Sequence, residues 1–521
     1  MTLLALLALA AATYVWRSFP VRDGALQLAG LQKPVRIERD GADVTHIRAQ
    51  SAHDAWMALG YVHAQERGWQ LEFNRRLMHG RLSEILGDAT LETDKLLRTL
   101  GIARAADRQY ANLPAEARSA LQAYSNGINA FFTQSSQALP PEFLLLGTQP
   151  GGGGPVWTPQ DSVGWALMMA LDLGGNWGNE FARLSAAKVL DTQRLWQLFP
   201  PYPGEKPAAS ADLSALYRSL GVYRTDAADA TKSLAVGAYP MPAAGIFDSD
   251  SAQNLRDWAT DWNQSAGTVE GKGSNNWVVA GSHSTSGKPL LANDPHLGLS
   301  APAIWYFARL QAPASRAPDG SSVPALDVIG ATLPGLPFVV LGRTSKVAWG
   351  FTNTGPDVQD LYLEQINPAN PQQYRLPDVD GQRAWGTFSQ RLETIQIKGQ
   401  PDLVLPVRES RHGPVLSDAQ SSHGELLDLK KYVLALRWSA LDSDNRTVLA
   451  GMRSNTAQSV EQLIAANADY HSPMQSMVAA DTTGKVAFKT IGKLPLRRPN
   501  DLMGMAPAPG WDAHYDWAGW I

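Results

Sequence analysis

Residues 271–279 read GKGSNNWVV, a glycine-rich segment that leads directly into an apolar stretch typical of a strand. Gly, Ser and Asn are ordinary turn residues, so the pattern by itself indicates first a loop that enters a sheet. A chemical function is also open to it. If the Gly273–Ser274 bond is cut, the freed α-amino group of Ser274, with a pKa near ~7.7–8, can act as general base for the hydroxyl of the same residue. Gly273 would favour the cut, because glycine tolerates the strained backbone that brings the hydroxyl onto the preceding carbonyl.

Two further segments carry polar side chains next to apolar strand-like stretches. Residues 290–299 contain His296 in a corner bounded by proline, where a single histidine is more often structural than catalytic. Residues 347–360 end in Asp357 and Asp360, three positions apart. Such a pair can bind a hard cation through oxygen ligands or simply solvate a turn, and the spacing leaves both readings open. The segment lacks the acidic ladder and glycine of an EF-hand loop, so a cation would need ligands from elsewhere in the chain.

Composition narrows the classes of protein and of nucleophile. The chain has 521 residues and a formal net charge of −4, too balanced for a protein that grips nucleic acid through many phosphate contacts. Charged residues make up 18% and tryptophans number 17, which indicates a folded protein with a large core and not a disordered chain. Cysteine is absent, which excludes disulfides, thiol nucleophiles and thiolate metal sites. Any nucleophile is therefore an oxygen or a nitrogen.

The elements that must position these residues change type along the chain. A hairpin is predicted for residues 35–38 and 44–47 around an Asp-Gly turn, and helical periodicity follows over residues 55–73, 114–132 and 158–190, the last interrupted at Gly174–Gly175. Thr158 is an expected N-cap. Beyond residue 273 strand patterns dominate, with one clear helix capped by Ser459. Helices first and strands second predict an α+β fold.

Both ends of the chain, and one segment within it, have unusual composition. Residues 1–20 hold an apolar run of roughly 15 residues, short for a bilayer span, and are expected to be a signal peptide or a signal anchor. Residues 225–273 are rich in Ala, Ser, Asp and Gly and resemble a linker. The chain stops at an apolar WAGWI where a polar tail would be more usual, so we expect the protein to continue past Ile521.

Five separated blocks together resemble the penicillin acylase (penicillin amidase) family of N-terminal-nucleophile hydrolases, which includes acyl-homoserine lactone and cephalosporin acylases. They occur in the family's order and are YVHAQER at 61–67, GRLSE at 80–84, GSNNWVV at 273–279, GKPLLANDPHLG at 287–298 and WGFTN at 349–353. The resemblance implies a four-layer αββα sandwich. It also implies a helical small chain over residues 21–225, a spacer over 226–273 that is removed on maturation, and a β-rich large chain from residue 274 to 521 that is truncated at its C-terminus.

The resemblance also assigns roles to single residues. Ser274 is the implied nucleophile, His296 falls where the family places a His or Gln beside the serine, and the backbone N–H of Asn353 falls at an oxyanion-hole position. The family's second oxyanion donor, an asparagine side chain, has no recognisable motif before Ile521. Loss of one such donor costs roughly 10²–10³ in rate, so its absence bears on the activity of the chain as given.

The resemblance further implies a structural Ca²⁺ that would join the two cleaved chains, one per heterodimer, and an apolar acyl pocket. The implied calcium ligands are Glu180, Asp357, Gln359, Asp360 and Pro495. Leu297, Phe338 and Gly174 match pocket positions, and glycine in place of a larger residue at 174 suggests a roomy site.

Together these features predict an exported, periplasmic or otherwise extracytoplasmic amide hydrolase that cuts itself before Ser274. Its substrate would be a β-lactam, an acyl-homoserine lactone or a related amide, and its partners its own cleaved chains, with an inner-membrane anchor at the N-terminus if the signal is retained. The alternative is an uncleaved, membrane-anchored, calcium-stabilised binding protein or an inactive fragment of the same fold. An ordinary Ser-His-Asp hydrolase is disfavoured, because no Gly-x-Ser-x-Gly elbow stands out.

Overall fold

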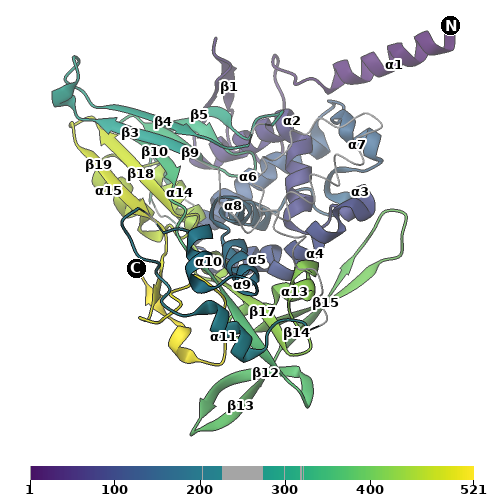
Figure 1. The fold of residues 1–521 in the computed structure, drawn as a ribbon. Coiled ribbons are helices and arrows are strands. Elements are labelled where there is room, and N and C mark those ends of the chain that lie inside the picture. Colours follow the sequence, from purple (N-terminus) through teal and green to yellow (C-terminus); the bar gives the residue numbers. More distant parts are fainter. Residues whose placement is uncertain (1, 202, 226–273, 299, 317–319, 321) are drawn as a thin grey trace.

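The computed structural model describes residues 2–201, 203–225, 274–298, 300–316, 320 and 322–521 (Figure 1). The predicted spacer, residues 226–273, lies outside the described residues. Helix α1 (Thr2–Ser18) projects away from the body of the molecule (Figure 1), and no helix in the described ranges has both the length and the apolar character needed to cross a membrane.

Helices dominate the chain before residue 225. After the short strands β1 (Arg36–Arg39) and β2 (Thr45–Arg48) come α2 (Ala52–Met78), α3 (Ser83–Leu86), α4 (Leu91–Leu100), α5 (Ile102–Asn112), α6 (Ala115–Gln134), α7 (Pro141–Leu146), α8 (Pro159–Gly174), α9 (Trp177–Ala187), α10 (Thr192–Leu198) and α11 (Leu213–Leu220).

Local signals placed the predicted elements correctly in this region. The β1–β2 hairpin and the helices α2 and α6 are confirmed. Helix α8 begins with a capping box in which Thr158 accepts from the Asp161 N–H and the Asp161 carboxylate accepts from the Thr158 N–H, with proline in the first turn. The break at Gly174–Gly175 is also confirmed, because α8 ends at Gly174 and α9 begins at Trp177.

Strands are the main regular elements of the chain from residue 274 onward. The largest sheet has eight strands in the order β1-β2-β5-β8-β9-β10-β18-β19. Besides β1 and β2 it contains β5 (Tyr306–Ala312), β8 (Leu326–Thr332), β9 (Val339–Thr344), β10 (Val347–Asn353), β18 (Gln475–Asp481) and β19 (Val486–Ile491). A second sheet has the order β13-β12-β11-β17, with β21 (Ala508–Pro509) beside β11; its strands are β11 (Gln359–Asn367), β12 (Asn370–Val379), β13 (Gln382–Thr387) and β17 (Tyr432–Trp438).

Smaller sheets and three helices complete the second half. The remaining strands are β3 (Ser274–Val279) with β4 (Leu290–Pro295), β6 (Ser315–Arg316) with β7 (Ser322–Val323), β14 (Ser389–Ile395) with β15 (Leu403–Ser410) and β16 (Gly413–Pro414), and β20 (Pro495–Arg497) with β22 (Trp517–Trp520). The helices are α13 (Ser421–Leu426), α14 (Thr447–Ser454) and α15 (Val460–Ala466), the last capped by Ser459 as predicted.

The two faces of the eight-stranded sheet have different neighbours. Alternate residues of β10, Val347, Trp349 and Phe351, join the apolar core that also contains buried residues of α2, α6 and α15. On the opposite face of the same strand, Gly350 lies against Asn293 of the β3–β4 hairpin. The α+β class is therefore confirmed. The described residues contribute a helical layer, the main sheet and a hairpin on the other face of that sheet.

Candidate active site

Ser274 is the first residue of β3 and pairs with Pro295 near the end of β4. The hairpin that these strands form lies on the main sheet, where the Asn276 side-chain amide donates to the Ser476 carbonyl of β18 at 2.9 Å. Ser274 is partly exposed and lines a cavity at this end of the hairpin. A residue cut free at this position would present both its hydroxyl and its amino group at the cavity wall.

Asn293 of β4 fixes the hairpin to the neighbouring strand β10. Its side-chain amide donates to the Asn275 carbonyl at 3.0 Å and to the Phe351 carbonyl at 2.8 Å, and its Oδ1 accepts from the Phe351 N–H at 3.0 Å. A Cβ on Gly350 would lie 2.7 Å from the Asn293 Cβ, so only glycine permits this approach. The sequence does not reveal this role of Asn293, because its hydrogen-bond partners on β10 are main-chain atoms that lie far away along the chain.

His296 presents its main chain, and not its ring, to Ser274. The His296 N–H donates to the Ser274 hydroxyl oxygen at 3.3 Å. The imidazole Nε2 instead lies 2.9 Å from Asp294 Oδ2, and the two side chains are 52% and 72% exposed. This geometry gives the residue a part in orienting the serine and no place as the base of a triad.

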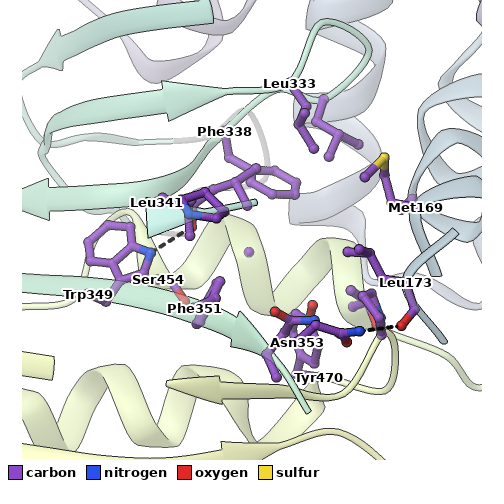
Figure 2. Close-up of a pocket in the computed structure, with 18 of the residues that line it drawn as sticks. Met169, Leu173, Leu333, Phe338, Leu341, Trp349, Phe351, Asn353, Ser454 and Tyr470 are labelled. Carbon is purple, nitrogen blue, oxygen red and sulfur yellow. Dashed lines mark hydrogen bonds between the residues drawn. The ribbon is translucent and has the colours of Figure 1, made fainter. Parts of the chain in front are cut away.

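The cavity begins at Ser274 and passes between β9 and β10, which pair only at Ala348↔Arg343 and Trp349↔Gly342 and then separate. It encloses about 900 Å³, counting the space at its mouth that is open to solvent. Figure 2 shows how side chains from α8, β9 and β10 and from the α14 region converge on it. Its principal apolar lining residues are Met169, Leu173, Leu297, Trp305, Leu333, Leu336, Phe338, Leu341, Trp349, Phe351 and Tyr470.

The predicted pocket residues fall in different places. Leu297 and Phe338 line the cavity, whereas Gly174 does not; its neighbour Leu173 does. A Cβ on Gly174 would meet Val358 at 3.9 Å, an ordinary contact distance. The glycine ends helix α8 next to Leu173, which does line the cavity, so the effect of a larger residue at 174 on the room in the cavity stays a prediction.

Asn353, the predicted oxyanion residue, lies at the end of β10 and lines the same cavity as Ser274. Its side-chain amide donates to the Leu173 carbonyl at 2.6 Å (Figure 2), and its Oδ1 accepts from Gln475 at 3.4 Å. These bonds tie the end of β10 to the last turn of α8. The side chain is therefore committed to structure, which leaves the main chain of this residue for any contact with substrate.

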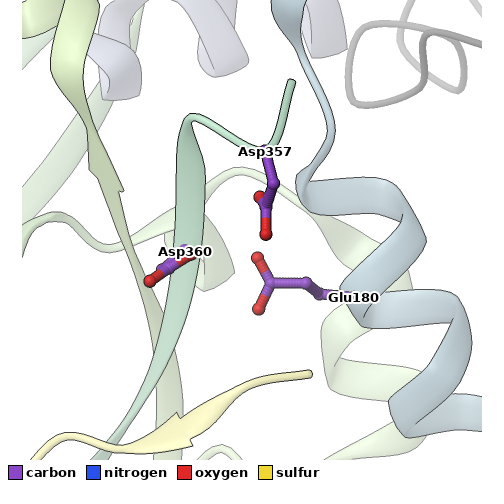
Figure 3. Close-up of side chains that lie close together, drawn as sticks. All are labelled: Glu180, Asp357 and Asp360. Atoms are coloured by element: carbon purple, nitrogen blue, oxygen red, sulfur yellow. The ribbon is translucent and has the colours of Figure 1, made fainter. Parts of the chain in front are cut away.

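A second site lies apart from the cavity, where Glu180 of α9 meets the start of β11. Single carboxylate oxygens of Glu180, Asp357 and Asp360 lie within 4.8 Å of one another. The Glu180 and Asp357 carboxylates point toward each other in Figure 3. The Leu361 N–H donates to both oxygens of Glu180 at 3.1 Å, which fixes that side chain on the strand.

The charge of this acidic cluster is incompletely balanced. Burial, with the charges of Asp360 and Asp357, raises the pKa of Glu180 well above its usual range. Burial also raises the pKa of Asp357 to about 7, although nearby Arg497 acts in the opposite direction. Arg497 donates to Asp360 at 3.0 Å and contacts Asp357 Oδ2 at 3.1 Å. Arg497 faces all three carboxylates and the charge of Arg183 also acts on Asp357, and the three acidic side chains are close enough together to hold a divalent cation.

Gln359 and Pro495, the two other calcium ligands that the family resemblance implies, do not lie among the three carboxylates in the same way. The Gln359 side-chain oxygen accepts from the N–H groups of Asn176 and Trp177 at 2.6 and 3.1 Å and so caps α9. Pro495 lies in β20, paired with Trp520, and it is Arg497 of the same strand that reaches the acidic cluster. Sequence reasoning missed Arg497, whose basic side chain gave no signal of a carboxylate site. Asn176 Oδ1 is buried without a hydrogen-bond partner in the part of the chain described, so this oxygen would fit a further ligand of a cation held by the cluster.

Comparison with known proteins identifies the family of this chain. A sequence model of the penicillin amidase family matches residues 34–521. The acyl-homoserine lactone acylase QuiP of Pseudomonas aeruginosa is 31% identical over 96% of this chain and 54% of its own length. The penicillin acylase 2 proenzyme of Pseudomonas sp. strain SE83 is 32% identical over 97% of this chain and 58% of its own length.

A solved structure, thermostable penicillin G acylase from Alcaligenes faecalis, matches with a TM-score of 0.38 and 25% identity over 47% of this chain and 40% of that chain. The chain belongs to the penicillin amidase family. It spans about half the length of the curated relatives that it matches.

Proposed function

We propose that this chain carries the nucleophile, the acyl cavity and the chain-joining metal site of a self-cleaving amide hydrolase. The observation that carries the proposal is the position of Ser274, at the first residue of a strand and on the wall of a largely apolar cavity. In the first step the Ser274 hydroxyl attacks the Gly273 carbonyl, the amide becomes an ester, and water then releases Gly273 as a carboxylate and Ser274 with a free amino group.

Catalysis then uses one residue twice. The α-amino group of Ser274 takes the hydroxyl proton as the oxygen attacks a substrate amide, passes it to the leaving amine, and later activates the water that hydrolyses the acyl-enzyme. The Asn353 N–H is the proposed oxyanion donor within this chain. The substrates proposed are N-acyl amides of the β-lactam or homoserine lactone type, whose acyl groups suit an apolar cavity.

The acidic cluster is the proposed calcium site. Its buried carboxylates are hard oxygen ligands of the kind that Ca²⁺ prefers, with Glu180 from one side of the cut and Asp357 and Asp360 from the other. Such an ion would join the two chains and take no part in the chemistry. We further propose that residues 1–20 direct export to the periplasm, as a signal peptide or as a signal anchor, and that 21–225, 226–273 and 274 onward are small chain, spacer and large chain.

Intact mass and N-terminal sequencing of the complete protein test the cut. We expect one fragment to begin at Ser274, and Ser274→Ala to remain uncut and inactive. The matched control is Ser282→Ala, an exposed serine on the same hairpin, which should process normally. An uncut wild-type chain would refute the proposed self-cleavage and favour the uncleaved binding protein. Normal cutting of Ser274→Ala would refute the assignment of Ser274 as the nucleophile.

A further inference from the structure

Gly451 on α14 lies directly against Phe338, a residue of the cavity wall. A Cβ at this position would lie 2.4 Å from Cε2, 2.6 Å from Cζ and 3.0 Å from Cδ2 of Phe338. Phe338 is 6% exposed and both residues line the cavity. The ring therefore rests directly on the helix backbone, and any side chain at 451 would have to displace it.

The backbone that carries Phe338 cannot retreat from α14. The Asn455 side chain clamps the next residue, accepting from the Val339 N–H at 2.8 Å and donating to the Val339 carbonyl at 2.8 Å. Asn455 is itself buried, at 3% exposure. On the other side of the loop the Tyr124 hydroxyl accepts from the Gly335 N–H at 2.7 Å. The loop is thus held on both sides by buried hydrogen bonds, and only the ring of Phe338 is free to turn.

The cavity is the open space that the ring of Phe338 lines. Elsewhere Phe338 packs in the core with Leu333, Leu336 and Leu449, and interiors of this kind are close-packed. A methyl group at 451 would add its own volume to the cavity wall and turn the ring into the cavity as well. Both effects reduce the room for an acyl group.

We propose that Gly451 is a specificity-determining residue that sets how large an acyl group the cavity accepts, by leaving the ring of Phe338 its place against α14. This rests on the proposed acylase function. Nothing in the local sequence requires glycine, since alanine is the better helix former in the interior of a helix. The requirement comes from the packing of Phe338.

The test is a selectivity ratio measured on the complete, processed protein. The ratios are kcat/KM for dodecanoyl over butanoyl homoserine lactone and for phenylacetyl over acetyl 6-aminopenicillanic acid. Gly451→Ala should lower the bulky-to-small ratio by ~10-fold or more, the effect typical of a methylene lost from or forced into an apolar site. Leucine at position 338 removes the clashing ring atoms, so the double variant Gly451→Ala with Phe338→Leu should recover most of the ratio.

The control is Gly424→Ala in α13, away from the cavity, where a Cβ would meet only the flexible Leu429 side chain at 3.2 Å. It should leave both ratios unchanged. An unaltered ratio in Gly451→Ala, or an equal loss for bulky and small acyl groups in a variant that still processes and unfolds at the wild-type midpoint, overturns the inference. A wild-type protein that hydrolyses none of the four amides instead refutes the proposed function itself.

Discussion

The hydroxyl of Tyr124 stands in a buried chain of hydrogen bonds whose proton positions follow from its geometry. Thr332 Oγ1 donates to the Tyr306 carbonyl at 2.7 Å, so it must accept the N–H of His63 Nε2 at 3.0 Å. His63 Nδ1 is then an acceptor, and the Tyr124 O–H donates to it at 2.6 Å. The Tyr124 oxygen in turn accepts from the Gly335 N–H. Every group is satisfied only while His63 is neutral, and burial, together with the charge of Arg67, lowers the pKa of His63 to about 3.

Tyr124→Phe removes the hydroxyl at the centre of this series of hydrogen bonds and adds no bulk. His63 Nδ1 loses its donor and the Gly335 N–H loses its acceptor, and all three residues are buried. An unsatisfied buried polar group costs about 1–3 kcal/mol, so two cost about 2–6 kcal/mol of unfolding free energy. The loop that lines the cavity also loses one of its two anchors, so KM for bulky acyl substrates should rise.

Urea denaturation followed by tryptophan fluorescence measures the loss in stability. Tyr110→Phe is the matched control, because Tyr110 is partly buried and its hydroxyl has no hydrogen-bond partner in the described parts of the chain. A Tyr124→Phe protein no less stable than Tyr110→Phe would show that the buried chain does not contribute as argued.

Three further outcomes are expected. Burial lowers the pKa of both His63 and His423 from 6.5 to about 3, so these two residues bind protons in the unfolded chain that they do not bind in the folded chain, and their contribution to the unfolding free energy should fall as pH drops below about 6.5, by up to about 1.4 kcal/mol per pH unit for each residue. The raised pKa values of Glu180 and Asp357 act in the opposite direction, so the measure is the difference between the urea-denaturation profiles of wild type and His423→Gln, and a difference that does not change with pH would contradict this. Calcium should raise the thermal midpoint of wild type but not of Asp357→Asn, with magnesium as the control ion, and a midpoint unaffected by chelator counts against the site. Asn293→Ala should lower kcat by about 10²-fold and slow processing, since Ser274 is displaced from β10; unchanged steady-state kinetics would exclude that positioning role.

Local chemistry explains which elements were predictable. Helix α8 begins after the N-cap Thr158, and α15 begins after the N-cap Ser459. Such starts can be predicted from sequence because the capping side chain bonds backbone groups only a few residues away. Helix α14, which lines the cavity, was not predicted. Its sequence TVLAGMRS contains a β-branched pair and a glycine, so its helical form depends on packing, chiefly against α15 and residues 467–469, and not on propensity.

The same division holds for the site. The sequence alone determined the candidate nucleophile Ser274, the acidic pair Asp357 and Asp360, and an oxygen or nitrogen nucleophile in a chain without cysteine, because these depend on residue type and on neighbours along the chain. Tertiary structure decided that the cavity passes between two separating strands, that Arg497 enters the acidic cluster, and that Gly451 lies against the ring of Phe338. Each of these depends on atoms that lie far apart in sequence and meet only when the main sheet and the helices pack together.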